Sequence, residues 1–99
     1  MMNKQNAFKT WLLEQGKNPR VAKDMGSRVS RVEAEFQKTQ PEFSLIGEYS
    51  KDKGTALMDM LLSAGRNLPD ENTLPRGRSA YPIANAVQWY FKYIESKEI

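Results

Sequence analysis

Residues 79–96 read SAYPIANAVQWYFKYIES, and this stretch decides which class of fold the chain adopts. Its apolar side chains recur every three or four positions, at Ile83, Ala86, Val87, Tyr90, Phe91 and Ile94. This spacing places them along one side of an α-helix, where they can be buried against other elements. Ser79 is suited to cap the start of the helix, and Pro82 is tolerated in a first turn. The stretch therefore predicts an amphipathic helix.

A second amphipathic helix is predicted from Asn18 to about Thr39. Asn18 is a favoured N-cap residue, and Pro19 suits the first helical position because a backbone N–H there would have no helical partner. Pro41 disfavours helix in the residue before it, which limits the helix at its end. Apolar residues again follow the helical spacing, at Val21, Met25, Val29, Val32 and Phe36. Gly26 lies inside this helix and lowers its helix propensity by about 1 kcal/mol relative to Ala.

Two further helices are expected at residues 4–15 and from residue 51 or 52 to 64, each followed by a glycine that can end a helix. Between them, residues 41–50 are predicted to form a single helical turn packed on the core, with a short extended segment as the alternative. Residues 67–77 are polar and contain proline and glycine, which predicts a surface loop.

The fold predicted from these elements is an all-α, compact single domain covering residues 1–99. It has four main helices and one short extra turn between the second and the third. The 99 residues suffice for one modest core, and the 39% hydrophobic and 27% charged content is typical of a globular chain. Short connections between helices favour antiparallel, bundle-like packing.

The composition restricts the chemistry that the chain can perform. It contains neither cysteine nor histidine, which rules out a zinc site built from these residues and catalysis by a thiolate or an imidazole. The acidic residues match neither a calcium loop nor a catalytic carboxylate pair, and the glycines do not form a phosphate-binding loop motif. We therefore expect no catalytic residues, no metal and no cofactor. No apolar run is long enough to span a membrane, and the N-terminus has no apolar core that would make it a signal peptide. With no cysteine available for disulfides, a reducing cytoplasm is the expected location.

The charges are distributed unevenly along the chain. Residues 1–38 carry eight Lys and Arg against four Asp and Glu, and residues 76–99 carry four against two. In residues 39–75 the balance is reversed, with three basic and six acidic residues. Basic ends with an acidic middle permit a nucleic-acid-binding face without requiring one.

The predicted helix from Asn18 carries one side rich in cations. At 100° per residue, the cations cluster around one direction, roughly a third of a turn from the apolar side chains; they are Arg20, Lys23, Arg28, Arg31 and Lys38. Asp24 and Glu35 interrupt this face, and Glu33 lies on the far side of the helix. Such a face can lie against DNA phosphates, because arginine forms charge-assisted hydrogen bonds to them and releases counterions. The alternative interpretation is an ordinary solvated helix face, with ion pairs such as Arg31–Glu35 and Arg20–Asp24.

A second candidate phosphate site is the junction Arg76-Gly77-Arg78-Ser79 before the last predicted helix. Backbone N–H groups at a helix start favour anions, and two arginines would add to that attraction. The alternative is a glycine turn followed by a serine cap.

Trp89 and Tyr93 lie four residues apart at the edge of the last helix's apolar face. They are a candidate surface for a partner helix or for base stacking, or else the rim of the core.

The arrangement resembles a known family in three places. These are Phe8-Lys9-Thr10-Trp11-Leu12, then the break Gly16-Lys17-Asn18-Pro19 before a long helix ending near Phe36, and finally residues 84–94, ANAVQWYFKYI. Together they resemble the N-terminal core-binding (SAM-like) domain of tyrosine recombinases and phage integrases. The resemblance implies a helical domain that forms one half of a clamp around duplex DNA and leaves the chemistry to a separate domain.

The leading functional hypothesis is a non-catalytic DNA-binding module that contacts duplex DNA mainly through phosphates. The candidate DNA-binding residues are Arg20, Lys23, Arg28, Arg31, Arg76 and Arg78. The alternative hypothesis is a small protein-interaction module or an accessory or inhibitor protein of a phage or mobile element. It would present the Trp89 and Tyr93 edge, or the acidic middle of the chain, to a protein partner.

Overall fold

The structure is a computed structural model that describes residues 4–63, 74, 78 and 80–97. In this part the chain forms five α-helices and no strands, which confirms the all-α prediction. The helices are α1 (Lys4–Glu14), α2 (Pro19–Gln37), α3 (Leu45–Asp52), α4 (Thr55–Leu62) and α5 (Ala80–Lys97).

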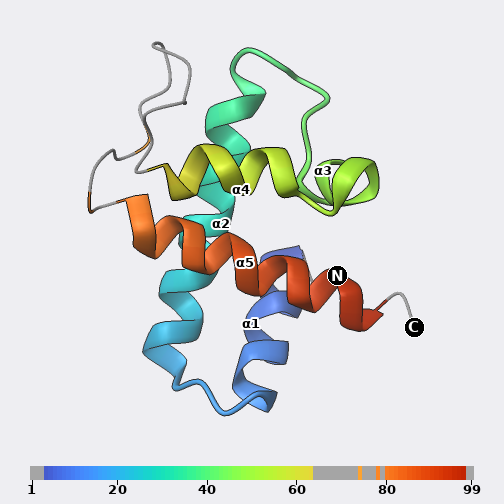
Figure 1. Cartoon of the computed structure of the whole chain (residues 1–99). Helices are drawn as coiled ribbons and strands as arrows, with labels where there is room; N and C mark the ends of the chain where they lie inside the picture. Colours follow the sequence, from blue (N-terminus) through green and yellow to red (C-terminus); the bar gives the residue numbers. More distant parts are fainter. Residues whose placement is uncertain (1–3, 64–73, 75–77, 79, 98–99) are drawn as a thin grey trace.

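Helix α5 is the centre of the packing. It contacts each of the other four helices, and Figure 1 shows it crossing the middle of the molecule with α4 above, α1 below and α2 behind. All six members of its predicted apolar stripe are buried, and Ala80 and Ala84 are buried as well. The predicted amphipathic helix is therefore confirmed, whereas its expected cap, Ser79, lies outside the described residues.

Helix α2 begins as the sequence predicts. The Asn18 side chain accepts a hydrogen bond from the Val21 N–H at 2.9 Å, and Pro19 occupies the first helical position. The helix ends at Gln37, two residues earlier than expected. Gly26 is buried, and a Cβ atom placed there would lie 3.2 Å from Cγ of Lys9 on α1. The missing side chain thus leaves room for the aliphatic stem of a lysine on the neighbouring helix.

The predictions for residues 41–50 and for the start of the helix that follows them are wrong. The expected single turn is a two-turn helix, α3, which extends to Asp52, and the next helix begins only at Thr55. Two side chains account for this start. The Ser44 hydroxyl accepts a hydrogen bond from the Gly47 N–H, and a carboxylate oxygen of Glu33 accepts one from the Leu45 N–H, both at 2.9 Å. Donors that a short helix would leave unpaired are thereby satisfied.

The break between α3 and α4 has its own local cause. Lys53 and Gly54 both adopt left-handed backbone conformations, with φ of 60° and 78°. The Asp52 carboxylate, expected near a helix start, closes α3 and accepts hydrogen bonds from the N–H groups of Gly54 and Ala56. The chain therefore turns sharply there and returns α4 to α5.

Gly54 is required by space as well as by its backbone angle. It is buried, and a Cβ atom placed on it would overlap the ring of Phe91 on α5. Gly16 provides a comparison, because its φ is 91° but a Cβ atom there would meet nothing within 4 Å. Both glycines have a positive φ, but only Gly54 lies against another side chain.

We predict that Gly54→Ala lowers the free energy of unfolding by about 3 kcal/mol, from left-handed strain and overpacking together. The control Gly16→Ala bears the strain alone and should cost about 1 kcal/mol. Urea unfolding followed by circular dichroism measures both. Equal losses in the two variants would show that α4 does not pack on Phe91 as described.

Candidate functional site

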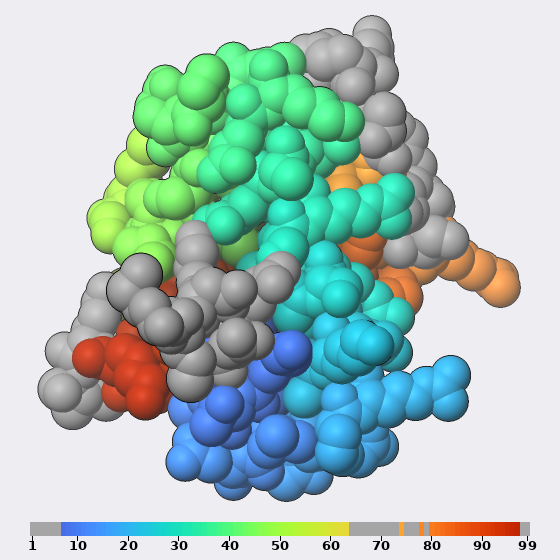
Figure 2. Space-filling view, turned by 180° about the vertical axis from the view of Figure 1, so that it is seen from behind, coloured from blue at the N-terminus to red at the C-terminus, as the bar shows by residue number. Residues whose placement is uncertain are grey.

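The candidate DNA-binding residues on α2 lie on its outer side. Arg20, Lys23 and Arg31 are exposed, and Arg28 is half-buried. Lys38, directly after the helix, is exposed too. Figure 2 shows the molecule from the α2 side, where the outer surface of this helix runs between α1 and the α3 region without another helix covering it. The fold therefore brings the predicted cations of α2 to one accessible surface.

The three acidic residues of α2 differ in how far they are buried. Asp24 is exposed, but Glu33 is half-buried and accepts the hydrogen bond from Leu45 N–H at the start of α3. Glu35 is only 8% exposed, and its Oε2 lies 3.0 Å from the Nζ of Lys38. Glu33 and Glu35 therefore take part in capping and pairing, whereas Asp24 is the one fully exposed carboxylate of α2.

The alternative interpretation expects ion pairs between neighbouring turns of α2, and the ion pairs in the structure differ from the expected ones. Glu35 forms an ion pair with Lys38, the residue directly after α2. No ion pair joins Arg20 to Asp24, both of which belong to the described part of the chain. Arg20 therefore keeps its guanidinium donors available to a ligand.

The second candidate phosphate site stays a prediction. Arg78 is exposed, as a phosphate contact requires. Arg76 and Ser79 lie outside the described residues, so the geometry of the junction with α5 is not defined.

Trp89 and Tyr93 are half-buried and belong to an aromatic cluster at the rim of the core. The ring centre of Trp89 lies 6.1 Å from that of Trp11, and the ring centre of Tyr93 lies 5.7 Å from that of Phe8. These contacts bind α1 to α5. They favour the interpretation of the two residues as the rim of the core over that of an open stacking surface.

Three lysines that the sequence analysis did not select surround this rim. The Nζ atoms of Lys17 and Lys92 lie 4.4 and 4.5 Å from the ring centre of Trp89, and Nζ of Lys97 lies 5.8 Å from that of Tyr93. Such distances are typical of cation–π contacts. The pairs Trp89–Lys92 and Tyr93–Lys97 could have been found from their helical spacing. The position of Lys17 follows only from the packing of α1 and α2 against α5.

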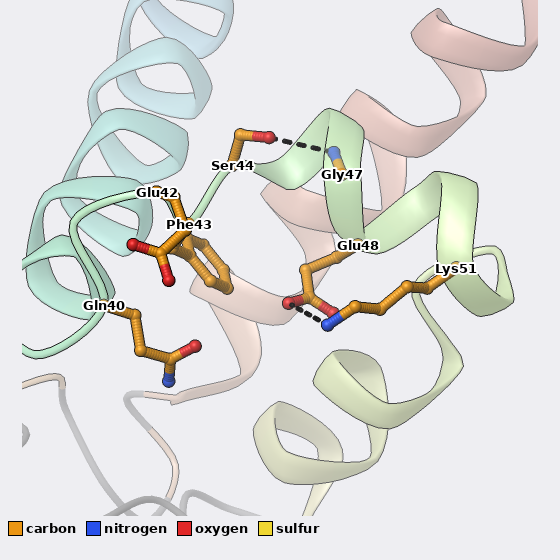
Figure 3. Close-up of a pocket in the computed structure, with 7 residues that line it drawn as sticks. All are labelled: Gln40, Glu42, Phe43, Ser44, Gly47, Glu48 and Lys51. Carbon is orange, nitrogen blue, oxygen red and sulfur yellow. Dashed lines mark hydrogen bonds and ion pairs between the residues drawn. The ribbon is translucent and has the colours of Figure 1, made fainter.

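A shallow pocket of about 200 Å³ lies between α3 and the chain that follows α2. Figure 3 shows Gln40 and Glu42 on one side, Glu48 and Lys51 on the other, and the ring of Phe43 between them. Its polar groups serve one another, because Ser44 accepts the Gly47 N–H and Glu48 lies 3.8 Å from Lys51. The pocket does not bring together residues suited to a particular reaction.

Two properties bear on other kinds of site. Among the described residues, no group of acidic side chains is arranged to hold a metal ion. In the same part of the chain, no helix has the length and apolar character needed to cross a membrane.

Comparison with known proteins adds no relative. No protein family, no curated protein and no solved structure matches the chain. The resemblance to the core-binding domain of tyrosine recombinases thus remains a prediction from the sequence.

A strongly perturbed titratable side chain, Tyr90, lies under the aromatic rim. Tyr90 is 1% exposed, and its hydroxyl has no hydrogen-bond partner in the described part of the chain. Burial raises the pKa of the Tyr90 phenol above its ordinary value, and the nearby charges of Glu33 and Tyr93 raise it further. Perturbed groups often mark functional sites, but this phenol is inaccessible to a ligand. We therefore interpret it as a structural group with an unsatisfied hydroxyl.

We predict that Tyr90→Phe raises the free energy of unfolding at neutral pH by about 1 kcal/mol, because it removes a buried hydroxyl that forms no hydrogen bond. The folded-state pKa lies above the unfolded value of about 10, so the native protein loses stability as pH rises past that value. Tyr90→Phe should lose less over the same range.

Thermal unfolding at neutral pH and at about pH 10.5, on the alkaline side of an ordinary tyrosine pKa, measures both effects. Tyr81→Phe is the matched control, because Tyr81 is exposed on the same helix and should behave like the unaltered protein. A marked loss of stability in Tyr90→Phe at neutral pH would show that the hydroxyl has a partner after all.

Proposed function

We propose that the chain is a DNA-binding module that uses the outer face of α2 to contact the phosphates of duplex DNA. In this proposal it resembles the non-catalytic core-binding domain of a tyrosine recombinase. The observation that carries the proposal is the unequal burial of charge on α2. Arg20, Lys23 and Arg31 are exposed together with one carboxylate, Asp24, whereas Glu33 is half-buried and Glu35 is buried.

The dimensions of this face suit a DNA backbone. Arg20 and Arg31 are eleven residues apart, which corresponds to about 16 Å along a helix axis. One DNA strand rises about 3.4 Å per nucleotide along the duplex axis, so the two arginines cover the axial rise of about five nucleotides when α2 lies parallel to that axis. A helix lying against the duplex can therefore place more than one cation near phosphates.

The same argument predicts how strongly binding depends on salt. Each phosphate neutralised by a cation releases condensed counterions, and contributes about −0.9 to the slope of log K against log salt concentration. Three exposed cations on α2 thus correspond to a slope of about −3. Phosphate contacts carry no base information, so sequence preference should be weak.

We predict that the double variant Arg20→Gln, Arg31→Gln reduces the magnitude of this slope by about two, because two phosphate contacts are lost. Fluorescence anisotropy of a labelled duplex of about 25 base pairs, titrated at several salt concentrations, measures the slope. The free energy of unfolding should stay within about 0.5 kcal/mol of the original, since exposed positions are substituted.

The matched control is Lys51→Gln, Lys53→Gln, which removes the same charge from exposed positions in and directly after α3. It should keep the original salt slope. Equal slopes in both double variants and the unaltered protein would contradict the assignment of the interface to α2. No duplex binding at any salt concentration would contradict the DNA-binding proposal itself.

A further inference from the structure

The lysine–tryptophan cluster, defined here as Lys17, Lys92 and Trp89, lies beside the start of α2. Both ammonium groups lie within 4.5 Å of the centre of the same indole ring, which places them less than about 9 Å apart. Lys17 belongs to the connection between α1 and α2, whereas Lys92 and Trp89 belong to α5. Tertiary packing therefore brings two like charges together.

Neither lysine of the cluster is neutralised locally. Among the described residues, no carboxylate lies within ion-pair distance of Lys17 or Lys92. The indole ring attracts both cations but supplies no negative charge, and each ammonium group has three donors that the ring does not fully occupy. A phosphate beside either lysine would receive charge-assisted hydrogen bonds from its ammonium group.

The cluster adjoins the proposed DNA-binding face. Lys17 is separated by only Asn18 and Pro19 from Arg20, the first cation of α2. Lys17 lies in the connection between α1 and α2, so the cluster is joined to the N-terminal end of that face by a short stretch of chain.

The contacts of Trp89 also discriminate between forms of nucleic acid. Binding of a single strand commonly relies on bases stacked on open aromatic rings. The Trp89 ring is already in contact with two lysines and with Trp11. The cluster is therefore equipped to receive phosphates rather than bases, which fits a duplex, whose bases are paired and stacked inside.

We propose that the lysine–tryptophan cluster is a second phosphate-binding surface that engages duplex DNA together with the outer face of α2. This inference rests on the proposed function and adds to it a site on α5 and a preference for duplex over single strands. Trp89 positions the two lysines, and the lysines make the contacts.

The test compares Lys17→Gln, Lys92→Gln with the control Lys51→Gln, Lys53→Gln in the anisotropy titration with the duplex. The cluster variant should lower the magnitude of the salt slope by about two and weaken binding at 0.1 M salt by roughly tenfold or more. The control should change neither. A single strand of the same length should bind more weakly than the duplex. Duplex binding should change tryptophan emission more in the unaltered protein than in Trp89→Phe, which keeps only Trp11.

The outcomes separate this inference from the function on which it rests. Unchanged binding in the cluster variant, with weakened binding in Arg20→Gln, Arg31→Gln, overturns the second surface and leaves the α2 interface standing. Weakened binding in the cluster variant alone supports the cluster and contradicts the α2 interface. Tighter binding of the single strand overturns the preference for duplex DNA. Absence of binding by the unaltered protein overturns both proposals.

Discussion

Burial of one side of α5 is the constraint on which the rest of the structure depends. This helix contacts all four others, so each of them is placed by the side chains that α5 presents to it. Tyr90 packs edge-on against Phe8 of α1 at 5.0 Å between ring centres, and Phe91 lies 5.7 Å from the ring centre of Tyr49 on α3. A domain is stable by about 5–15 kcal/mol in total, and truncation of one buried aromatic residue costs about 3–5 kcal/mol. Single residues of α5 are therefore decisive for the whole fold.

The same packing determines the charge that the surface presents. α2 turns Val29, Val32 and Phe36 inward, and the rotation that achieves this also sets the direction of every charged residue on the helix. Glu33 becomes a partner for the start of α3, and Glu35 is nearly enclosed. Arg20, Lys23 and Arg31 are left exposed, as is Asp24. α2 carries residues of both signs, and three of its four exposed charged residues are basic.

Local signals predicted much of the fold and part of the candidate site. The Asn18 cap, the start of α2 and the apolar stripe of α5 follow from neighbouring residues, and the structure confirms them. The exposure of Arg20 and Arg31 also follows, since it depends on their angle from the apolar side of their own helix. The extent of α3 could not be predicted in this way, because one of its capping groups belongs to Glu33, twelve residues before Leu45.

The sequence by itself determined the class of fold, the helical segments with strong periodicity, and the absence of histidine and cysteine chemistry. These properties depend on residue type and on spacing of a few positions along one helix. Only the tertiary structure decided that Glu33 pairs with the start of α3 and that Gly54 must lie against Phe91. It alone also brought Lys17 to Trp89. Each of these contacts joins residues from different elements, and their approach is set by how the helices share one core rather than by any local preference of the chain.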